Sequence, residues 1–517
     1  MHQVRSFLQG AWCAGAAPTT PIHDPTTGAQ NGEVSSHGLD LAAALDHART
    51  VGGPTLRAMT FAQRGELLGQ LSAALHTARD PLIDIARQCM GATRGDAKFD
   101  IDGAAGTLAY YANLGKTLGD RTYLLDGDQI RISRSSRFLG QHILVPKTGV
   151  AVHINAFNFP AWNLCEKAAC ALLAGVPVLA KPGTATAWLA EAVVALWVDQ
   201  GLLPAGTLQL LCGSAGDLLD HVGPQDVIVF TGSSGTARSI RTHPTVVANS
   251  VPVNVEADSL NAAVLGPDVE PGSDTWQMFI GDVVKEITQK AGQKCTAVRR
   301  IVVPAEREAE VVEALTSRLQ DQPVGDPAEL RTVVGPLASP AQKRDVERGL
   351  AELSQNATLV WRGHDPKQGC FVPPQLWRAE GGAGAAYVHD HEVFGPVATL
   401  LPIDGSAAAV VAVGARGGGG LVCSVYSDDR AWCAEVLLGL APWHGRILWG
   451  SAKVFDQGTG HGSVLPSLVH GGPGKAGGGE ELGGERGLRH YLQRTAIQGD
   501  TQLLRAVFGK IDAAPPA

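Results

Sequence analysis

The sequence lacks the features of proteins that cross or bind a membrane and of proteins that bind a polyanion. No run approaches 18 consecutive apolar residues, and the first ten residues contain no basic region followed by an apolar core. The formal net charge of −8 is small for 517 residues, which argues against bulk electrostatic binding of nucleic acid or of an anionic membrane surface. We therefore expect neither a nucleic-acid partner nor a membrane partner.

The nine cysteines lack the short, repeated spacings of a disulfide framework or of a zinc site. An odd number of scattered cysteines fits a reducing compartment. The sequence therefore predicts a cytoplasmic protein, and it implies no metal site.

The common glycine-rich dinucleotide fingerprint is also missing, because no Gly-x-Gly-x-x-Gly follows any predicted strand. The nearest substitute is Thr231-Gly232-Ser233-Ser234-Gly235, which lies between a predicted strand and a predicted helix. Free backbone N–H groups at the N-terminus of a helix favour a phosphate. This turn is therefore a candidate phosphate-binding site.

The composition, with 44% hydrophobic and 18% charged residues, is that of an ordinary globular protein, and the length predicts two or three domains. Residues 1–38 are rich in turn-forming residues. From 39 to 119, leucines recur at steps of three and four, which predicts a helical layer packed on a sheet. Residues 121–148 alternate between apolar and polar, which indicates an extended hairpin.

Strand and helix patterns alternate from Val150 onward, and this predicts parallel βαβ units in a sheet covered on both faces. A second alternating region runs from Glu256 to about Gly450, and we interpret it as a separate α/β domain. Glycine dominates residues 458–487, which indicates either close backbone approach or mobility.

Cys295 follows Gly292-Gln293-Lys294 and a helix-like run over 282–290, so its thiol is predicted at the end of an element. Several further motifs accompany it in a fixed order: Asn158 within Asn155–Pro160, Lys181-Pro182, Phe230–Ser234, Glu256 and Glu392–Pro396. Together these motifs resemble the NAD(P)-dependent aldehyde dehydrogenase superfamily across nearly the whole chain. The segments His470–Gly474 and Arg494–Gly499 are similar to the branch that contains the dehydrogenase half of the ring-opening enzyme of phenylacetate degradation.

The resemblance implies an α/β, aldehyde dehydrogenase-like fold with three parts. A Rossmann-type cofactor domain would comprise residues 1–120 and 149–255, and an α/β catalytic domain would comprise 256–450. A small β oligomerisation arm would comprise 121–148 and 488–517, with Arg489–Gly499 as its C-terminal strand. The Gly-rich segment 451–487 would return to the active site. Because arms of this kind form the subunit contact in the family, a homodimer is expected rather than a tetramer.

The resemblance also implies a mechanism in which the Cys295 thiolate adds to an aldehyde. The resulting oxyanion would receive hydrogen bonds from the Asn158 side-chain amide and the Cys295 backbone N–H. After hydride leaves, Glu256 would activate water to hydrolyse the thioester. Ala257-Asp258-Ser259 follows Glu256 where the family usually has Leu-Gly-Gly, so Asp258 is the alternative base.

Further positions match the family more loosely. Lys167 occupies the place of a lysine near the active site, where an ion pair with a carboxylate such as Glu256 is an equally good interpretation. Glu481 matches a glutamate proposed as a proton-relay partner. His389 and His391 are expected to be solvated loop residues.

For the coenzyme, the resemblance places Lys181 and Pro182 beside the adenosine ribose, Thr231, Gly232 and Ser233 at the phosphates, and Glu392 and Phe394 at the nicotinamide riboside. NAD-preferring members commonly carry Glu where this chain has Thr184. Threonine would not repel a 2′-phosphate, so NADP is expected to be preferred, with NAD used more weakly. The alternative interpretation is that Thr184 caps the following helix, a role that Thr186 could equally fill.

The expected substrate is a small-molecule aldehyde, specifically a CoA-linked semialdehyde of aromatic (benzoate) catabolism. A broad-specificity dehydrogenase for small aldehydes is the main alternative. An acylating enzyme, which transfers the acyl group to CoA, would lack the Glu256 base, and a binding-only relative would lack Cys295 and Asn158.

Overall fold

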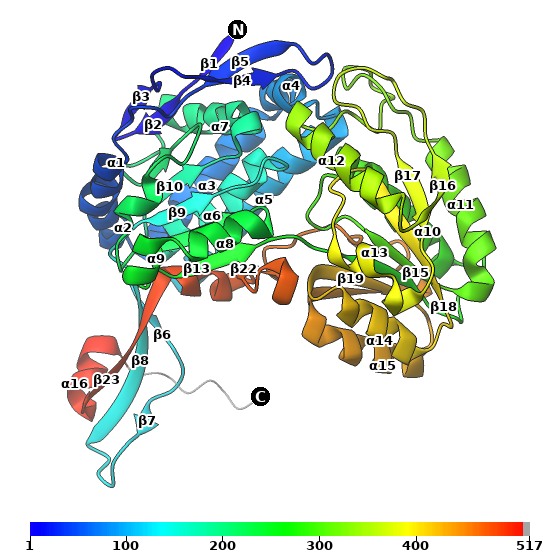
Figure 1. The fold of residues 1–517 in the computed structure, drawn as a ribbon. Helices are drawn as coiled ribbons and strands as arrows, with labels where there is room; N and C mark the ends of the chain where they lie inside the picture. Colours follow the sequence, from blue (N-terminus) through cyan, green and yellow to red (C-terminus); the bar gives the residue numbers. More distant parts are fainter. Residues whose placement is uncertain (510–517) are drawn as a thin grey trace.

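The computed structural model describes residues 1–509, which form two α/β regions and an arm that projects from them (Figure 1). The first region contains a seven-stranded sheet in the order β13-β12-β9-β10-β11-β2-β3. From β13 to β11 the strands are parallel, and β2 and β3 continue the sheet antiparallel. Its strands are β2 (Ser6–Leu8), β3 (Ala11–Cys13), β9 (Ala151–Ile154), β10 (Val178–Lys181), β11 (Leu208–Leu210), β12 (Val227–Thr231) and β13 (Val253–Glu256).

Helices cover both faces of this sheet, as the alternating pattern predicted. Alternate strand residues such as Val178 and Leu179 belong to different apolar clusters, because successive side chains point to opposite faces. One face packs on α6 (Pro160–Ala174) and α7 (Ala187–Asp199), and the other on α1 (Leu41–His47), α8 (Ser234–Arg241) and α9 (Pro244–Ala248). The predicted helical layer is present and packs on α6 and α7; it comprises α2 (Gly53–Ala58), α3 (Phe61–Thr77), α4 (Arg79–Met90) and α5 (Arg94–Leu118).

The N-terminal 38 residues are more regular than their turn-rich sequence suggests. β1 (His2–Val4), β4 (Thr20–His23) and β5 (Gln30–Val34) form a three-stranded sheet, while β2 and β3 extend the large one. These strands are only three to five residues long, too short for an alternating pattern to show. Most of them pair with one another within these 38 residues, and β2 also pairs with the distant β11 through Phe7 and Leu210.

The second region contains a seven-stranded sheet in the order β16-β17-β18-β15-β14-β19-β20, parallel except for β16. Its strands are β14 (Ala262–Leu265), β15 (Arg300–Pro304), β16 (Thr358–Arg362), β17 (Gln375–Arg378), β18 (Val397–Ile403), β19 (Gly420–Tyr426) and β20 (His444–Gly450). One face packs on α10 (Asp274–Thr288) and α11 (Glu308–Gln320), and the other on α12 (Pro340–Leu353), α13 (Ala386–Asp390), α14 (Ala407–Arg416) and α15 (Arg430–Leu440).

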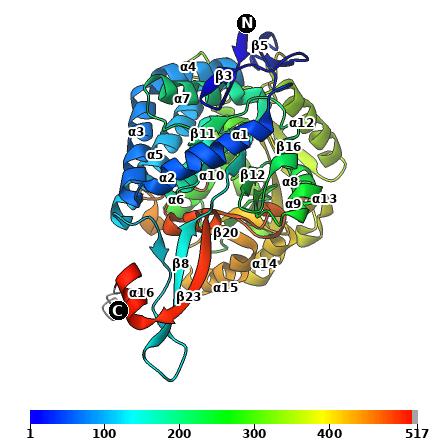
Figure 2. The same cartoon turned by 90° about the vertical axis from the view of Figure 1, so that its left-hand side faces the viewer.

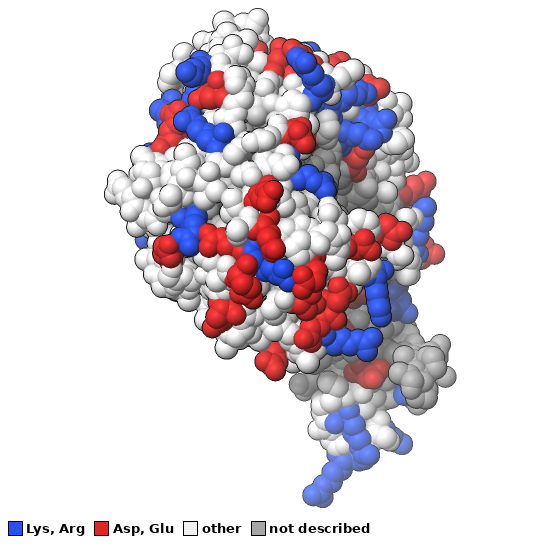
Figure 3. All heavy atoms as spheres, turned by 90° about the vertical axis from the view of Figure 1, so that its right-hand side faces the viewer, with Lys and Arg blue, Asp and Glu red and all other residues white. Residues whose placement is uncertain are grey.

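The arm is a β-structure that projects toward the bottom of Figures 1 and 2. β8 (Phe138–Pro146) pairs antiparallel with β23 (Leu492–Asp500) along nine residues, and β6 (Leu124–Leu125) and β7 (Ile130–Arg131) pair with β8. The predicted hairpin and its C-terminal strand are thus confirmed. α16 (Thr501–Phe508) follows β23, and the rest of the predicted 488–517 segment, residues 510–517, lies outside the described residues. In Figure 3 both signs of charge mix over the body, whereas Lys and Arg gather at the end of the arm.

The Gly-rich segment lies against the first sheet, and its glycines permit close backbone approach. β21 (Val469–Gly471) pairs antiparallel with β22 (Glu480–Leu482). A Cβ on Gly477 or Gly479 would clash with the backbone of Val255 in β13, and Gly477 has a positive φ of 107°. The backbone of this segment is therefore held beside the end of β13. No helix within residues 1–509 is long and apolar enough to cross a membrane.

Candidate active site

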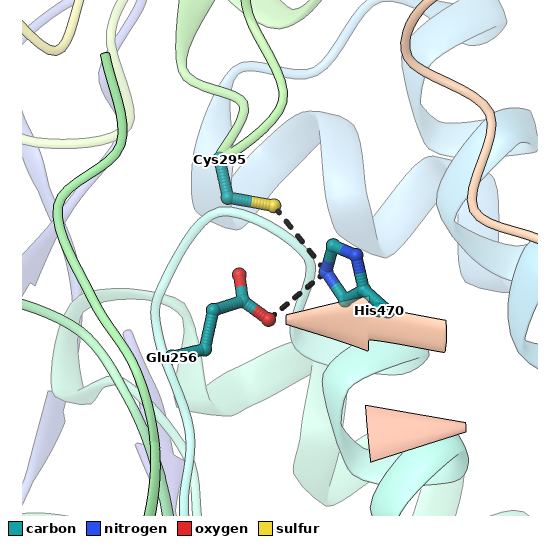
Figure 4. A group of neighbouring side chains, drawn as sticks. All are labelled: Glu256, Cys295 and His470. Atoms are coloured by element: carbon teal, nitrogen blue, oxygen red, sulfur yellow. Dashed lines mark hydrogen bonds and ion pairs between the residues drawn. The ribbon is translucent and has the colours of Figure 1, made fainter. Parts of the chain in front are cut away.

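Glu256 and Thr231 lie side by side at the carboxyl ends of the neighbouring parallel strands β13 and β12. In open α/β sheets, ligands bind beyond this edge. The Glu256 side chain is 2% exposed and points toward Cys295, which comes from the other region, and toward His470 of β21 (Figure 4). The predicted nucleophile and the predicted base are therefore brought together by three separate parts of the chain.

The turn before Cys295 has an unusual backbone. Lys290, Ala291 and Gly292 have φ values of 53°, 50° and 68°, three consecutive residues in the left-handed region that non-glycine residues rarely adopt. The turn reverses the chain after α10. Beyond it, the Asn261 side-chain amide donates to the Cys295 carbonyl at 2.8 Å, and His461 Nε2 lies 2.8 Å from the Thr296 carbonyl. Sequence reasoning missed both of these supporting residues.

A cleft opens in front of Cys295. Apolar side chains make much of its wall, whereas Asn158, Glu256 and His470 supply polar groups; the apolar members are Phe99, Phe159, Trp162 and Val464. The Asn158 Nδ2 donates to the Gln293 carbonyl at 3.1 Å. A side-chain amide has two N–H donors, so one remains for the expected oxyanion.

His470 is the main functional residue that sequence reasoning missed. Its Nε2 lies 2.9 Å from Glu256 Oε2 and 3.9 Å from Cys295 Sγ. The sequence held one indication, since His470 opens a segment that supported the family resemblance. Because one ring nitrogen faces both neighbours, His470 cannot donate to Glu256 and accept the thiol proton at the same time.

Burial and charge act in opposite directions at these three groups. Burial disfavours the carboxylate of Glu256, but His470 and then Lys167 outweigh it and lower the pKa of that carboxyl. Burial also disfavours imidazolium, yet the Glu256 carboxylate raises the pKa of His470. Burial, followed by the Glu256 charge, raises the pKa of the Cys295 thiol well above its usual range. These shifts all favour an ion pair between His470 and Glu256 beside a protonated Cys295 thiol.

Lys167 forms its ion pairs with carboxylates other than the predicted Glu256. Its Nζ lies 3.0 Å from Glu166 and 3.1 Å from Glu481. Although burial opposes the cation, the Glu481 and Glu166 carboxylates raise the pKa of Lys167. Burial raises the pKa of Glu481. The Lys167 cation opposes this shift, and the neighbouring Glu166 carboxylate adds to it. In the β21–β22 pair, Glu481 lies opposite His470, which brings its side chain to the same face.

The residues predicted to bind the adenosine lie at the end of β10 and just after it. Lys181 Nζ donates to the Pro182 carbonyl at 3.0 Å and to Thr184 Oγ1 at 3.4 Å, and Thr184 donates to the Gly213 carbonyl at 3.1 Å. Thr186 lies at the N-cap of α7, but its hydroxyl donates to the Phe157 carbonyl instead of capping the helix. Neither threonine therefore caps α7 with its side chain.

The turn after β12 leads into α8, with Ser233 as the N-cap that accepts from the Thr236 N–H. The Thr231 hydroxyl is buried and has no hydrogen-bond partner among the described residues. Asp258, the alternative base, points to this turn: it accepts from Ser234 Oγ at 2.5 Å and from Ser234 N–H at 3.3 Å. A carboxylate thus already lies at the helix N-terminus where a coenzyme phosphate is expected.

Glu392 and Phe394 belong to the loop that follows α13. Glu392 pairs with Arg299 at 3.0 Å and accepts from the Ser259 N–H at 3.1 Å. The Phe394 ring packs edge-on against Phe157. His389, expected in solvent, is fully buried; Arg300 lies 3.1 Å from its Nδ1. That expectation was wrong because His389 belongs to the short helix α13 and packs against Arg300, whereas His391 is exposed as expected.

Comparison with known proteins decides the family, because the model of the aldehyde dehydrogenase family matches residues 12–497 of this chain. The chain belongs to this family. It is therefore an oxidoreductase that acts on aldehydes, and the family uses NAD(P). The family membership and the α/β fold implied by the sequence motifs are both confirmed.

One relative in sequence and two solved structures are similar to most of this chain. The chain is 47% identical over 479 residues to 3,4-dehydroadipyl-CoA semialdehyde dehydrogenase of Aromatoleum evansii, covering 91% of this chain and 93% of that protein. The structure of 3,6-anhydro-L-galactose dehydrogenase in complex with NADP matches with a TM-score of 0.83 at 20% identity, covering 96% and 100% of the two chains. Betaine aldehyde dehydrogenase of Staphylococcus aureus with NAD+ matches with a TM-score of 0.82 at 22% identity, covering 96% of each chain. At these identities the two structures establish the fold.

Proposed function

We propose that this aldehyde dehydrogenase oxidises a CoA-linked semialdehyde, of the 3,4-dehydroadipyl-CoA semialdehyde type, to the carboxylate with NADP in aromatic (benzoate) catabolism. The observation that carries the proposal is the 47% identity to the Aromatoleum evansii enzyme over 91% of this chain. The cleft supports it, since its largely apolar wall suits the carbon chain of a semialdehyde while polar groups gather at Cys295.

The chemistry begins at Cys295, whose thiolate attacks the aldehyde carbon. The oxyanion accepts hydrogen bonds from the free Asn158 N–H and the Cys295 backbone N–H. When bound, the coenzyme accepts the hydride, which leaves a thioester on Cys295. Glu256 then takes a proton from water as that water attacks the thioester carbonyl. Glu481, whose pKa is raised by burial, can accept the proton from Glu256, while Lys167 remains a cation paired with Glu481.

The thiol proton of Cys295 needs an acceptor, and the ion pair between His470 and Glu256 determines which group accepts it. Glu256 is the acceptor when His470 is an imidazolium, because the single facing nitrogen of His470 then already holds a proton. The cation at His470 also stabilises the thiolate that results. His470 thus acts by positioning charge, and Glu256 acts as the base in both half-reactions.

The residues at the coenzyme positions fit a phosphorylated adenosine. Lys181 supplies a cation, and the buried Thr231 hydroxyl lacks a partner among the described residues, so a ligand would satisfy it. Lys181, Pro182 and Thr184 would hold the adenosine ribose, and Thr231, Gly232 and Ser233 the phosphates. Glu392 and Phe394 would hold the nicotinamide riboside. The neutral Thr184 beside Lys181 favours NADP, with NAD used more weakly.

The proposal also includes a cytoplasmic location, a division into domains and a homodimeric assembly. All nine cysteines are free thiols, which supports a cytoplasmic location. We assign residues 1–120 and 149–255 to coenzyme binding, 256–450 to catalysis, 451–487 to the returning segment, and 121–148 with 488–517 to the arm. The exposed outer edge of β23 supports a homodimer formed through the arm.

A broad-specificity dehydrogenase for small aldehydes uses the same catalytic residues, so substrate competition is the decisive test. We expect kcat/KM for a CoA-linked semialdehyde to exceed that for butanal and hexanal by orders of magnitude, and NADPH to be formed. Free semialdehyde without the CoA group serves as the matched control. Equal kcat/KM for all of these aldehydes would reject the proposed substrate class while leaving aldehyde oxidation intact.

A further inference from the structure

The three side chains at the centre of the active site can also bind a metal ion. The Cys295 thiol sulfur, a His470 ring nitrogen and a Glu256 carboxylate oxygen all lie within 4.8 Å of one another (Figure 4). Nε2 of His470 is 2.9 Å from Glu256 Oε2 and 3.9 Å from Cys295 Sγ. All three atoms therefore face one small volume at the mouth of the cleft.

This spacing is close to what tetrahedral zinc requires. With Zn–S of about 2.3 Å and Zn–N and Zn–O of about 2.0–2.2 Å, neighbouring ligand atoms are roughly 3.3–3.6 Å apart. His470 and Glu256 would separate by a few tenths of an ångström, and Cys295 would approach His470 by a similar amount. The widest spacing, between Cys295 and Glu256, reaches up to 4.8 Å and would have to shorten by roughly 1 Å. Side-chain rotations can supply such shifts without moving the backbone.

The donor types select the metal. A thiolate, an imidazole and a carboxylate form a borderline-soft set that suits Zn²⁺, whereas Mg²⁺ and Ca²⁺ require oxygen ligands. Three protein ligands leave the fourth tetrahedral position open toward the cleft, as in catalytic zinc sites. A water molecule, or the carbonyl oxygen of an aldehyde, would fit that position.

The scaffold holds these ligands on ordered elements. Glu256 ends β13, and His470 lies on β21, whose partner segment packs its glycines against Val255. Asn261 fixes the Cys295 carbonyl. Lys167, a buried cation whose charge acts on Glu256, is matched by its own two carboxylates, so it does not leave an unbalanced positive charge near the metal.

We propose that Cys295, His470 and Glu256 form a Zn²⁺ site that reversibly switches the enzyme off. Zinc bound there takes the place of the thiol proton and of the proton between His470 and Glu256, and it engages the sulfur that would attack the substrate. Inhibition should therefore be competitive with the aldehyde. The inhibition rests on the proposed nucleophile, Cys295, whereas zinc binding can be measured without any substrate.

The test uses the reduced, chelator-treated full-length protein. Competition with a chromophoric chelator should give one bound Zn²⁺ per chain. Cys295→Ala and His470→Gln should each bind Zn²⁺ at least tenfold more weakly, because losing a residue that only hydrogen-bonds to a metal ligand already lowers metal affinity roughly 10–100-fold. Cys13→Ala, which removes a partly exposed thiol outside the cleft, is the matched control and should bind normally. Co²⁺ should give a thiolate-to-metal charge-transfer band that both cleft variants lose.

A wild-type measurement keeps the test decisive if a variant folds poorly. Alkylation of Cys295 by iodoacetamide, followed by mass spectrometry, should slow at least about tenfold with Zn²⁺ and remain unchanged with Mg²⁺. Stoichiometric zinc binding that leaves Cys295 alkylation unchanged would overturn the site, as would equal protection by Mg²⁺. Because no aldehyde is present, failure of the proposed substrate class would not alter either outcome.

Discussion

His470 and Glu256 form a buried ion pair, with Nε2 of His470 2.9 Å from Oε2 of Glu256, although 214 positions of sequence separate them. The pair places His470 within reach of Cys295, and it lowers the pKa of the proposed catalytic carboxyl although that carboxyl is buried. Breaking such a pair leaves an uncompensated buried charge, which is costly. The pair therefore links the stability of the protein to its chemistry.

Replacing the nucleophile should separate chemistry from binding. Cys295→Ala should lower aldehyde oxidation by several orders of magnitude, because among residues 1–509 no other thiol lines the cleft. NADP binding, measured by titration calorimetry, should change little. Cys13→Ala should keep full activity, and substantial steady turnover by purified Cys295→Ala would contradict the assignment.

Replacing the base should uncouple the two half-reactions. Glu256→Gln should still give a burst of NADPH, smaller or slower if Glu256 also ionises Cys295, and steady turnover should collapse as the thioester accumulates. Stopped-flow absorbance and intact-protein mass spectrometry would detect both effects. Asp258→Asn is the comparison, since Asp258 contacts Ser234. Loss of turnover in Asp258→Asn with full turnover in Glu256→Gln would transfer the role to Asp258.

Removing the imidazole should lower stability in a pH-dependent manner. The folded-state pKa of His470 is raised above its ordinary value of 6.5, so its contribution is fully present below pH 6.5 and is lost as pH rises through the raised value. His470→Gln should cost about 3–5 kcal/mol at pH 6 and less at pH 9, measured by urea unfolding. The double variant His470→Gln/Glu256→Gln should recover part of the loss; an equal cost at both pH values would refute the linkage.

Changing Thr184 should alter coenzyme choice. We expect the parent to favour NADP, and Thr184→Glu to lose NADP efficiency, because like charges near a protein surface repel by roughly 1–4 kcal/mol. Thr184→Gln, which is similar in size but neutral, should keep the preference. The measurement is kcat/KM for both coenzymes, and a parent that favours NAD would show that Thr184 does not set this choice.

Shortening the arm should disturb assembly. Ending the chain at Gln493 removes most of β23, which pairs with β8 over nine residues, and the Arg494 contact with Asp126. The bared edge of β8 should give monomers or aggregates in light scattering. A chain that ends at Gly509 keeps β23 and α16 and should assemble normally. An unchanged oligomer in the shorter protein would show that the arm is not the subunit contact.

The elements and several site positions could be predicted because they depend on local patterns. Gly175 ends α6 in the left-handed conformation that glycine favours at this position, and Lys181, which the family motif singled out, ends β10. The strands at residues 1–38 could not, since strands of three to five residues are too short to show an alternating pattern. His389 was misjudged because its burial comes from the packing around Arg300.

The sequence by itself determined the chain's family and the alternation of its elements, and it led to the prediction that Cys295, Glu256 and Asn158 are its reactive groups. Only the tertiary structure decided which charges meet: His470 with Glu256, Lys167 with Glu481, and Asp258 with Ser234. Local periodicity reports which face a side chain occupies. It does not report which distant strand or loop lies opposite, because sheet register and the close approach of glycine backbones fix that only in the folded protein.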